Sequence, residues 1–200
     1  MSAEDQVALE RARVAVLDGR LIGFATETVW ALACAAQPDA VARLAAAKGR
    51  PEGKPFQVLC ADPARAASFF RLDERLRARF LTLAPLWPGP LTLVAPASPL
   101  APAALVSNGR VGVRVPDHVH AHAVLNAVGG ALAASSLNLS GEVAASTFEQ
   151  ALAYALADVL LPGPDAAGLA STVVDLETGV VLREGAVRAD AVREALACTP

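Results

Sequence analysis

Cationic side chains are distributed unevenly in this 200-residue chain. Only two of its seventeen Lys and Arg residues are lysines, and both lie in one short stretch that contains Lys48, Arg50 and Lys54. A lysine ammonium is a compact point charge, whereas an arginine guanidinium is a planar fork of donors. Together such groups are suited to neutralising phosphate and carboxylate oxygens, so this stretch is the first candidate for a site that binds charged substrates. The alternative is a solvated surface turn.

Three further polar segments interrupt an otherwise apolar sequence, each beside a predicted strand. They are residues 26–28, the segment with Ser136, Asn138 and Ser140, and Ser171 with Arg183. Ligands of α/β proteins gather where strands end and loops begin. Hydroxyls, amides and cations with few acidic groups are what a polyphosphate site requires. Taken singly, each segment is equally typical of a helix cap or a turn.

Arg114 stands in a predicted strand whose neighbours are Val and Gly. Its guanidinium must contact an anion or reach solvent, because a buried unpaired charge is very costly. A structural carboxylate and a substrate anion are both compatible with this position. Glu27 also has two interpretations, as a solvent-facing cap residue or as a contact for metal or substrate.

Several common catalytic sites are excluded. The stretch from Gly49 to Lys54 has three residues between its glycines where a P-loop has four, and Pro55 stands where a P-loop has Ser or Thr. The chain has no Gly-x-Ser-x-Gly elbow. The histidines at 118, 120 and 122 match some zinc-ligand spacings but also a polar helix start, and we predict no metal site there. Catalysis would then depend on aligning charged substrates and stabilising their charge.

The elements that must position these residues alternate along the chain. Periodicity and turn residues predict helices at about 4–17, 39–48, 63–70, 73–83, 118–128 and 147–157, and at the C-terminus. Short apolar runs predict strands at about 21–25, 56–60, 91–95, 111–115, 131–134, 159, 172–176 and 180–183. This alternation indicates an α/β fold with helices packed on a mixed sheet. The length fits a single domain, residues 1–200, with its core at about 7–187.

Composition narrows the class of protein. The net charge of −3 argues against broad electrostatic binding of nucleic acid. No apolar run is long enough for a membrane span, and the acidic N-terminus does not resemble a signal peptide. Three widely spaced cysteines are expected to be reduced thiols, so we expect a cytoplasmic protein without membrane contact. The arginines at 71, 75, 77 and 79 are interpreted as a solvated helix face, with a tRNA or partner contact as the alternative.

Taken together, these segments resemble the YrdC/TsaC family of threonylcarbamoyl-AMP synthases in its short, single-domain form. The matching pieces keep the family's order and spacing over about residues 19–187, and they are Thr26-Glu27-Thr28-Val29-Trp30-Ala31-Leu32, Lys48-Gly49-Arg50-Pro51 with Lys54-Pro55, Trp87-Pro88-Gly89-Pro90-Leu91-Thr92, Val113-Arg114-Val115-Pro116-Asp117-His118, Asn138-Leu139-Ser140-Gly141, Ser171-Thr172-Val173-Val174-Asp175 and Leu182-Arg183-Glu184-Gly185. The resemblance implies a twisted mixed α/β sheet flanked by helices, with a concave, positively lined cavity.

The resemblance also implies a reaction. L-threonine, bicarbonate and ATP give threonylcarbamoyl-AMP and pyrophosphate with the help of Mg²⁺, and a tRNA threonylcarbamoyl transferase complex uses the product. A direct contact with tRNA is a further option. By motif, the implied catalytic residues are Lys48, Arg50 and Lys54. The implied ATP-binding residues are Arg50, Lys54, Ser136, Asn138, Ser140 and Arg183, and the implied threonine-binding residues are Thr26, Thr28, Arg114 and Ser171.

Departures from the family's usual pattern include Trp30, Ala31, Leu137 and Glu184. Leu137 lies between Ser136 and Asn138 and is expected to narrow the nucleotide pocket. The Ala-Leu pair at 31–32 is similar to YciO-type paralogues, although the Lys-x-Arg and Asn-x-Ser-Gly segments that those proteins tend to lose are present. Two alternatives therefore stay open: a YciO-like protein with a different small substrate, and a non-catalytic module that binds structured RNA.

Overall fold

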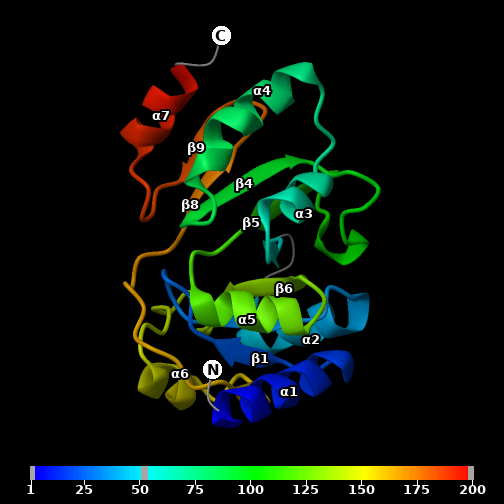
Figure 1. Ribbon diagram of the computed structural model, residues 1–200, viewed down its shortest axis with the longest axis vertical. Helices are drawn as coiled ribbons and strands as arrows, with labels where there is room; N and C mark the ends of the chain where they lie inside the picture. The colour runs from blue at the N-terminus through cyan, green and yellow to red at the C-terminus, as the bar shows by residue number, and fades with distance from the viewer. Residues whose placement is uncertain (1–2, 51–53, 198–200) are drawn as a thin grey trace.

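The computed structural model describes residues 3–50 and 54–197, in which nine strands form one mixed sheet (Figure 1). The strand order across the sheet is β7-β1-β2-β6-β3-β5-β4-β8-β9. In chain order the strands are β1 (Ile22–Phe24), β2 (Ala31–Cys34), β3 (Gln57–Cys60), β4 (Leu91–Pro96), β5 (Arg110–Arg114), β6 (Ala131–Ser136), β7 (Val159–Leu160), β8 (Thr172–Asp175) and β9 (Val181–Arg183). The predicted α/β class with a mixed sheet is confirmed.

The middle of the sheet is assembled from distant parts of the chain. β1 pairs in parallel with β7, β3 with β5, and β4 with β8, whereas the other neighbours are antiparallel. Gln57 of β3 lies opposite Gly112 of β5 on one side and Ala134 of β6 on the other. These pairings bring segments that are separated by more than fifty residues side by side.

Helices cover the sheet in both halves of the molecule. The half at the bottom of Figure 1 holds α1 (Ala3–Leu17), α2 (Pro38–Lys48), α5 (Val119–Ala127) and α6 (Phe148–Tyr154). The half at the top holds α3 (Pro63–Ser68), α4 (Glu74–Leu83) and α7 (Ala189–Ala197). Helix α1 packs on α5, and α4 packs on α7. Two short 3₁₀ helices complete the connections, η1 (Ala84–Leu86) and η2 (Ala103–Leu105).

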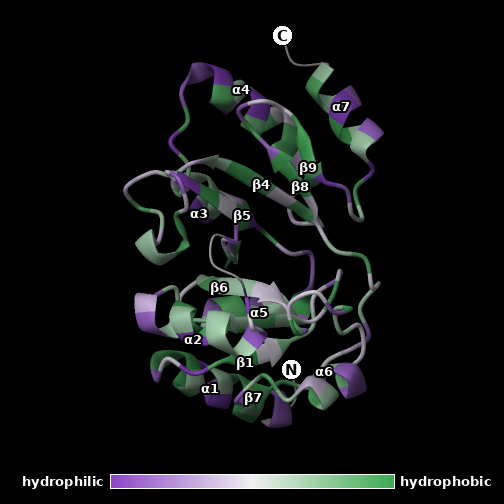
Figure 2. Ribbon diagram, turned by 180° about the vertical axis from the view of Figure 1, so that it is seen from behind, coloured by the Kyte–Doolittle hydropathy of each residue, from purple (hydrophilic) through white to green (hydrophobic). Residues whose placement is uncertain are grey.

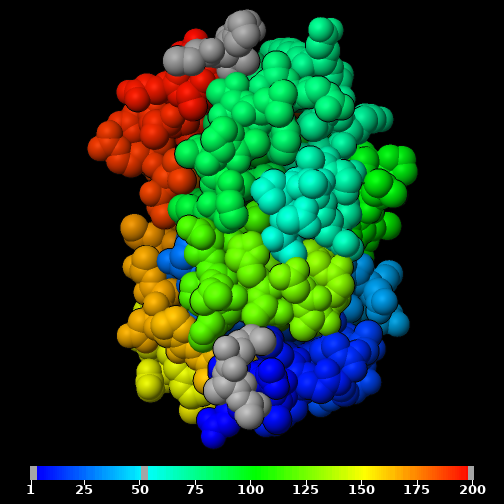
Figure 3. Space-filling view, in the orientation of Figure 1, coloured from blue at the N-terminus to red at the C-terminus, as the bar shows by residue number. Residues whose placement is uncertain are grey.

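Two apolar clusters form the core. The larger one includes Trp30, Leu44 and Trp87, and the smaller one lies between α1, α5 and β1 and includes Phe24 and Leu125. Figure 2 shows hydrophilic residues on the helices that border the molecule and mostly apolar residues along the strands between them. In the space-filling view of Figure 3, side chains fill the spaces between the ribbons of Figure 1. Helices α3 and α4 cover the upper half of this face, and α5 and α1 cover the lower half.

Local sequence explains how α2 presents the cationic stretch. Pro38 occupies its first turn, where the missing N–H costs nothing. Gly49 ends the helix in the left-handed region with φ 57°; its N–H donates to the Ala46 carbonyl, and the N–H of Arg50 donates to the Ala45 carbonyl. The chain therefore turns sharply between Lys48, which points into the protein, and Arg50, which lies at the sheet.

The predicted elements agree with the structure except at β2. The helices and the other strands occur within a few residues of their predicted bounds, although the helix predicted at 147–157 ends at Tyr154. No strand was predicted at Ala31–Cys34, because Ala has little preference for strands. Pairing with β1 and β6 on its two sides makes this segment a strand. No helix among the described residues is both long and apolar enough to cross a membrane.

Candidate active site

A cavity of about 620 Å³ lies over one face of the sheet. Side chains of a strand alternate between its two faces, so every second residue of neighbouring strands contributes to the cavity floor. Across the sheet from β6 to β9, these residues include Ser136, Gln57, Arg114, Thr92, Asp175 and Arg183. Gly112 and Ala134 belong to the same floor, and their small size leaves room above it.

The residues predicted from sequence divide into two groups. Those that line the cavity are Arg50, Arg114, Ser136, Ser171 and Arg183. Those that lie outside its lining are Thr26, Thr28, Lys48, Lys54, Asn138 and Ser140. The fold therefore gathers the arginines and two of the hydroxyls into one space, and it places the lysines elsewhere.

Three arginines form what we call the arginine row, namely Arg50, Arg183 and Arg114. Burial lowers the pKa of Arg50, and the charge of Arg183 lowers it further. Burial likewise lowers the pKa of Arg183, with a further contribution from the charge of Arg114. Within residues 3–50 and 54–197, neither Arg50 nor Arg183 has an ion-pair partner. The row is thus a line of mutually repelling cations that an anionic ligand would stabilise.

Arg50 is held by the loop that follows it. Its Nε donates to the carbonyl of Lys54 at 2.9 Å, and Nη2 donates to that of Pro55 at 2.8 Å. Nη1 donates to Ser135 Oγ at 3.0 Å, and the guanidinium carbon lies 4.4 Å from the centroid of the Phe56 ring. These contacts fix the direction of the charge, which is what a preorganised anion site needs.

Arg183 belongs to a polar network on the cavity floor. Its Nη2 donates to the carbonyl of Ser171 at 2.8 Å and to its Oγ at 3.3 Å. Ser171 Oγ lies 2.9 Å from Thr92 Oγ1, and Thr92 Oγ1 donates to Gln57 Oε1 at 2.9 Å. Sequence reasoning did not select Gln57, Thr92 or Ser135. Gln57 and Thr92 were detectable as polar residues within apolar strands, but only the pairing of β3, β5 and β4 shows that they face the same cavity.

Arg114 has a carboxylate partner. Its Nη2 lies 2.7 Å from Glu27 Oε1, and its Nε donates to the carbonyl of Gly89 at 3.2 Å. Burial lowers the pKa of Arg114, and the charge of Glu27 offsets part of that shift. Of the two sequence-based interpretations, the structure shows a carboxylate at this position. Arg114 also lines the cavity, so the structure is compatible with the substrate interpretation as well.

Lys48, with Ser136 and Asn138, forms what we call the lysine corner. The Lys48 side chain is 2% exposed, and its Nζ donates to the Ser136 carbonyl, to the Asn138 carbonyl at 2.7 Å and to Asn138 Oδ1 at 3.2 Å. Burial and the charge of Arg50 lower the pKa of Lys48 to about 8. The ammonium therefore ties the end of α2 to the end of β6. The predicted catalytic role of Lys48 stays a prediction.

Asn138 completes the lysine corner. Its Nδ2 donates to the carbonyls of Leu139 and Glu142, and its Oδ1 accepts from Ser136 Oγ. Ser140 is exposed, and its backbone N–H donates to the Lys48 carbonyl at 2.9 Å. Each of these contacts shapes the loop after β6. The predicted contacts of these residues with ATP stay predictions.

The expectation that Leu137 narrows the cavity is wrong. Leu137 is fully buried in the larger apolar cluster, and a Cβ added at Gly23 of β1 would lie 2.9 Å from its Cδ1. Its side chain therefore points away from Ser136 and into the core, as the alternation of strand residues requires. The bulk of Leu137 fills the space beside a glycine.

The remaining departures from the family pattern have local explanations. Trp30 is buried and packs on Phe148, with ring centroids 5.7 Å apart. Ala31 pairs with Phe24 and Ser136 in the sheet. Glu184 Oε1 accepts the N–H of Ala189 at 3.0 Å, which caps the start of α7.

Thr26 and Thr28 are buried in the turn after β1. Thr26 Oγ1 donates to the Val29 carbonyl at 2.6 Å and lies 2.9 Å from Thr28 Oγ1. The hydroxyl of Thr26 therefore fixes the turn that leads into β2. The predicted contacts of Thr26 and Thr28 with threonine stay predictions.

The histidine run and Lys54 lie outside the cavity lining. His118 caps α5, since its Nδ1 accepts the N–H of Ala121 at 3.4 Å. Burial and the charge of His120 lower the pKa of His118. In the part of the chain that the structure describes, no group of three or more His, Cys, Asp or Glu residues is placed to hold a metal ion. The side chain of Lys54 is exposed.

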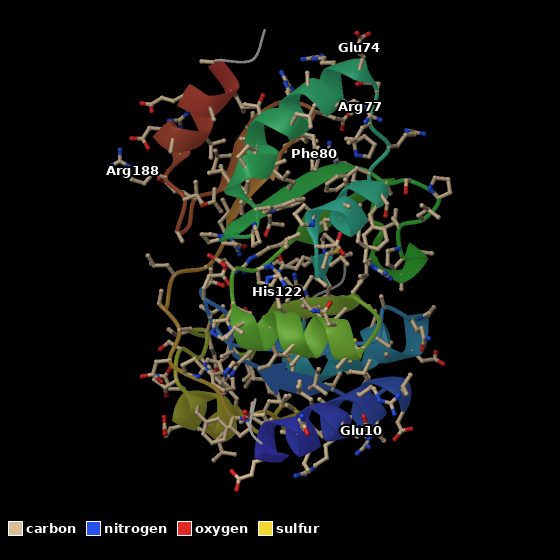
Figure 4. All side chains as sticks on the ribbon, viewed as in Figure 1. Glu10, Glu74, Arg77, Phe80, His122 and Arg188 are labelled. Atoms are coloured by element: carbon tan, nitrogen blue, oxygen red, sulfur yellow. The ribbon has the colours of Figure 1, made fainter. Side chains whose placement is uncertain are left out.

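The arginines at 71, 75 and 77 are exposed, whereas Arg79 donates to the carbonyls of Leu176 and Glu177. Figure 4 shows Arg77 at the outer end of α4. The interpretation as a solvated face therefore holds for the three exposed residues, and Arg79 instead anchors the turn between β8 and β9.

Comparison with known proteins identifies relatives of this chain. A threonylcarbamoyl-AMP synthase of Chromobacterium violaceum is 36% identical over 180 residues, which cover 87% of this chain and 91% of that protein. One from Pyrococcus abyssi is 33% identical over 187 residues, which cover 85% of this chain and 52% of that protein. The crystal structure of P. abyssi Sua5 complexed with L-threonine superposes with a TM-score of 0.87 at 28% identity over 98% of this chain. The present chain spans 59% of that longer protein.

Other comparisons bear on the fold and on the family. Escherichia coli YciO superposes with a TM-score of 0.81 over 92% of this chain and 91% of that protein, at 24% identity, which supports the fold alone. The Sua5/YciO/YrdC family, described as telomere recombination, matches residues 14–185. That range contains the arginine row, the lysine corner and every strand of the sheet. The chain is therefore a member of the Sua5/YciO/YrdC family.

Proposed function

We propose that this protein synthesises threonylcarbamoyl-AMP from L-threonine, bicarbonate and ATP, with release of pyrophosphate. The observation that supports this most strongly is the arginine row in a cavity of about 620 Å³. Its relatives point the same way, since similar proteins are threonylcarbamoyl-AMP synthases and a Sua5 structure contains L-threonine. The product would serve tRNA modification in the cytoplasm.

The reaction joins three molecules in two bond-forming steps. The ammonium of threonine loses a proton to solvent, and the resulting amine and the carbon of bicarbonate form a carbamate with loss of water. A carbamate oxygen then attacks the α-phosphorus of ATP, and the bond to pyrophosphate breaks. Negative charge grows on the departing pyrophosphate, so cations fixed beside it lower the barrier. Arg50 and Arg183 are placed to supply that charge, with directions fixed by their contacts to the loop and to Ser171.

Binding of threonine is assigned to the other end of the arginine row. A guanidinium fork recognises a carboxylate by paired hydrogen bonds, and Arg114 contacts Glu27 in the turn that also contains Thr26 and Thr28. Ser171 and Thr92 offer hydroxyls on the same floor. These residues would orient the amino acid so that its nitrogen faces the bicarbonate.

Mg²⁺ is proposed to enter with ATP. Mg²⁺ keeps several waters and is commonly held by one or two carboxylates together with substrate phosphates. Asp175 is the carboxylate in the described lining of the cavity, and Arg110 pairs with it at 2.6 Å. The donor set therefore fits a metal held mainly by phosphate oxygens. When bound there, Mg²⁺ would neutralise phosphate charge.

Pyrophosphate release by the purified protein tests the proposal. We expect release only when ATP, L-threonine and bicarbonate are all present, and loss of the signal when either small substrate is omitted. Release that ignored threonine would point to a YciO-like protein with another substrate. Binding of tRNA that weakens with salt and is not accompanied by turnover would point to an RNA-binding module. Transfer of the product to tRNA by the transferase complex is a separate assay.

A further inference from the structure

The carboxylate oxygens of Glu27 are buried, and their ion-pair partner is the Arg114 guanidinium. Its Oε1 lies 2.7 Å from Arg114 Nη2, and the two side chains are 21% and 3% exposed. Both carboxylate oxygens of Glu27 and Nη2 of Arg114 are themselves buried, and no aligned hydrogen bond reaches them from the described residues. The pair is therefore close in distance but poorly oriented.

Such an arrangement is expensive for a folded protein. A buried carboxylate normally accepts several hydrogen bonds, and an ion pair compensates for burial only when its geometry is good. The loop after β7 holds the backbone of this turn, since Ala167 N–H donates to the Glu27 carbonyl at 3.3 Å and Gly168 N–H donates to that of Thr28 at 2.8 Å, so a change of partner would involve the Glu27 side chain alone. The structure thus keeps an under-satisfied carboxylate beside a cavity-lining arginine, which is common at functional sites.

The charges around Glu27 narrow what could satisfy it. Arg114 is the cation in contact with it, and His118 is near enough to interact with it electrostatically. Burial and the charge of His120 lower the pKa of His118, so His118 is mostly neutral near pH 7 and adds little positive charge. A ligand whose carboxylate forms an ion pair with Arg114 would displace Glu27 and leave it without a counter-ion. The same ligand restores neutrality if it also carries a positive group.

An α-amino acid has this pair of charges on one carbon atom. Its carboxylate can accept two hydrogen bonds from the Arg114 fork, and its ammonium can donate to the Glu27 carboxylate a few ångströms away. One misaligned ion pair within the protein is then exchanged for two aligned pairs with the ligand. The total charge of the pocket does not change during this exchange, which keeps its electrostatic cost low.

We propose that Glu27 binds the ammonium group of the amino-acid substrate, and that the Glu27–Arg114 pair opens to receive that substrate as a zwitterion. This inference rests on the proposed function, since it concerns the threonine of the same reaction. It makes Glu27 a specificity-determining residue, which selects ligands that have both a carboxylate and an adjacent ammonium. A purely structural ion pair would have no such preference.

Calorimetric titration of the full chain tests the inference with three ligands. These are L-threonine, 3-hydroxybutanoate, which lacks the ammonium, and threoninol, which lacks the carboxylate. We expect the wild-type protein to bind threonine at least about 10-fold more tightly than either analogue, because each loses one charge-assisted contact. Equal affinity for threonine and 3-hydroxybutanoate would overturn the inference without any variant, so the test does not depend on how a mutant folds.

The variant Glu27→Gln keeps the size of the side chain and removes its charge. We expect it to bind threonine about 10- to 100-fold more weakly and to bind 3-hydroxybutanoate as well as the wild type does or better, because Arg114 is no longer neutralised. The matched control is Glu149→Gln, at an exposed position on α6, for which no change is expected. If Glu27→Gln weakens both ligands by the same factor, Glu27 only supports Arg114 and the inference is wrong.

These outcomes separate the inference from the proposed function. A wild-type protein that binds threonine but does not distinguish it from 3-hydroxybutanoate contradicts the role of Glu27 and leaves the proposed function intact. A wild-type protein that binds no threonine, with or without ATP, contradicts the proposed function and the inference together.

Discussion

The lysine corner and the arginine row use positive charge in opposite ways. In the lysine corner, the Lys48 ammonium is 2% exposed and donates to three oxygens of Ser136 and Asn138. In the arginine row, Arg50 and Arg183 line the cavity, and burial lowers the pKa of each, with a further contribution from the charge of the next arginine in the row. The first arrangement satisfies a buried cation with the protein's own carbonyls. The second leaves Arg50 and Arg183 without a carboxylate partner among the described residues, whereas Arg114 pairs with Glu27.

The difference separates a structural cation from a binding one. A buried ammonium with three protein acceptors already has its full set of partners. Its hydrogen bonds therefore stabilise the contact between α2 and β6. Adjacent arginines that repel each other destabilise the fold unless a ligand compensates. Each region therefore makes a different prediction for stability and for ligand binding.

The largest expected effect is on stability, from Lys48→Met. This change keeps the length of the side chain and removes the donors to the carbonyls of Ser136 and Asn138. Buried carbonyls without donors cost about 1–3 kcal/mol each, so we expect the free energy of unfolding to fall by about 3 kcal/mol at pH 7. Urea denaturation measures it. The control is Lys54→Met, at an exposed position in the same stretch, which should change stability by less than about 0.5 kcal/mol. Similar losses in the two variants would contradict the assignment of Lys48 to the lysine corner.

The next effect is on ligand binding, from Arg183→Gln. Removing this charge relieves repulsion within the arginine row, so we expect stability to change by less than about 1 kcal/mol. The kcat/KM for ATP should fall by about 100-fold, because Arg183 would stabilise the departing pyrophosphate. Denaturation and a pyrophosphate assay measure the two quantities. Arg188→Gln is a suitable control, since Arg188 is exposed on the way into α7 and pairs with Asp190 (Figure 4). A loss of stability as large as that of Lys48→Met would erase the contrast between the two regions.

A third effect is the pH dependence of the lysine corner. The pKa of Lys48 is about 8 in the folded protein, below its ordinary value of 10.5. Between these values the unfolded chain binds more protons, so the contribution of Lys48 to stability rises with pH in this window. The stability difference between wild type and Lys48→Met should therefore grow by about 2 kcal/mol from pH 8 to pH 10. Urea denaturation of both proteins across this range measures it, and other titrating groups cancel in the difference. A constant difference would mean that Lys48 titrates at its ordinary value.

The contrast between the two regions also shows what the sequence could predict. The alternation of elements and the four polar segments were visible because period, turn residues and residue chemistry are local properties. The direction in which each side chain points was not visible in the sequence. Lys48 and Arg50 are two residues apart, yet Gly49 ends α2 between them and sends one into the core and the other to the cavity. Leu137 was misassigned for the same reason, because its face depends on the register of β6.

Residues of the cavity floor were missed for a second physical reason. Gln57 and Thr92 become neighbours only through the pairing of β3 with β5 and of β5 with β4. Non-local register of this kind has no signature in a short segment of sequence. The ion pair between Glu27 and Arg114 is similar, since it joins the turn after β1 to the end of β5.

The smallest effect compares two exposed cations, Lys54 and Arg77. The backbone carbonyl of Lys54 accepts from Arg50, whereas Arg77 lies at the outer end of α4. If the loop of Lys54 borders the bound triphosphate, Lys54→Ala should lower kcat/KM for ATP by about 10-fold, and Arg77→Ala should leave it unchanged. Neither variant should alter stability by more than about 0.5 kcal/mol.

Steady-state pyrophosphate assays at two salt concentrations measure this comparison. A charge that acts on ATP through solvent is screened by salt, so the deficit of Lys54→Ala should shrink as salt rises. Equal activities of the two variants would limit the cations of the site to the arginine row. The Lys54 side chain would then be solvated, and only its backbone carbonyl, which accepts from Arg50, would contribute to the site. The outcome therefore decides whether Lys54 binds ATP together with the arginine row or belongs to neither the arginine row nor the lysine corner.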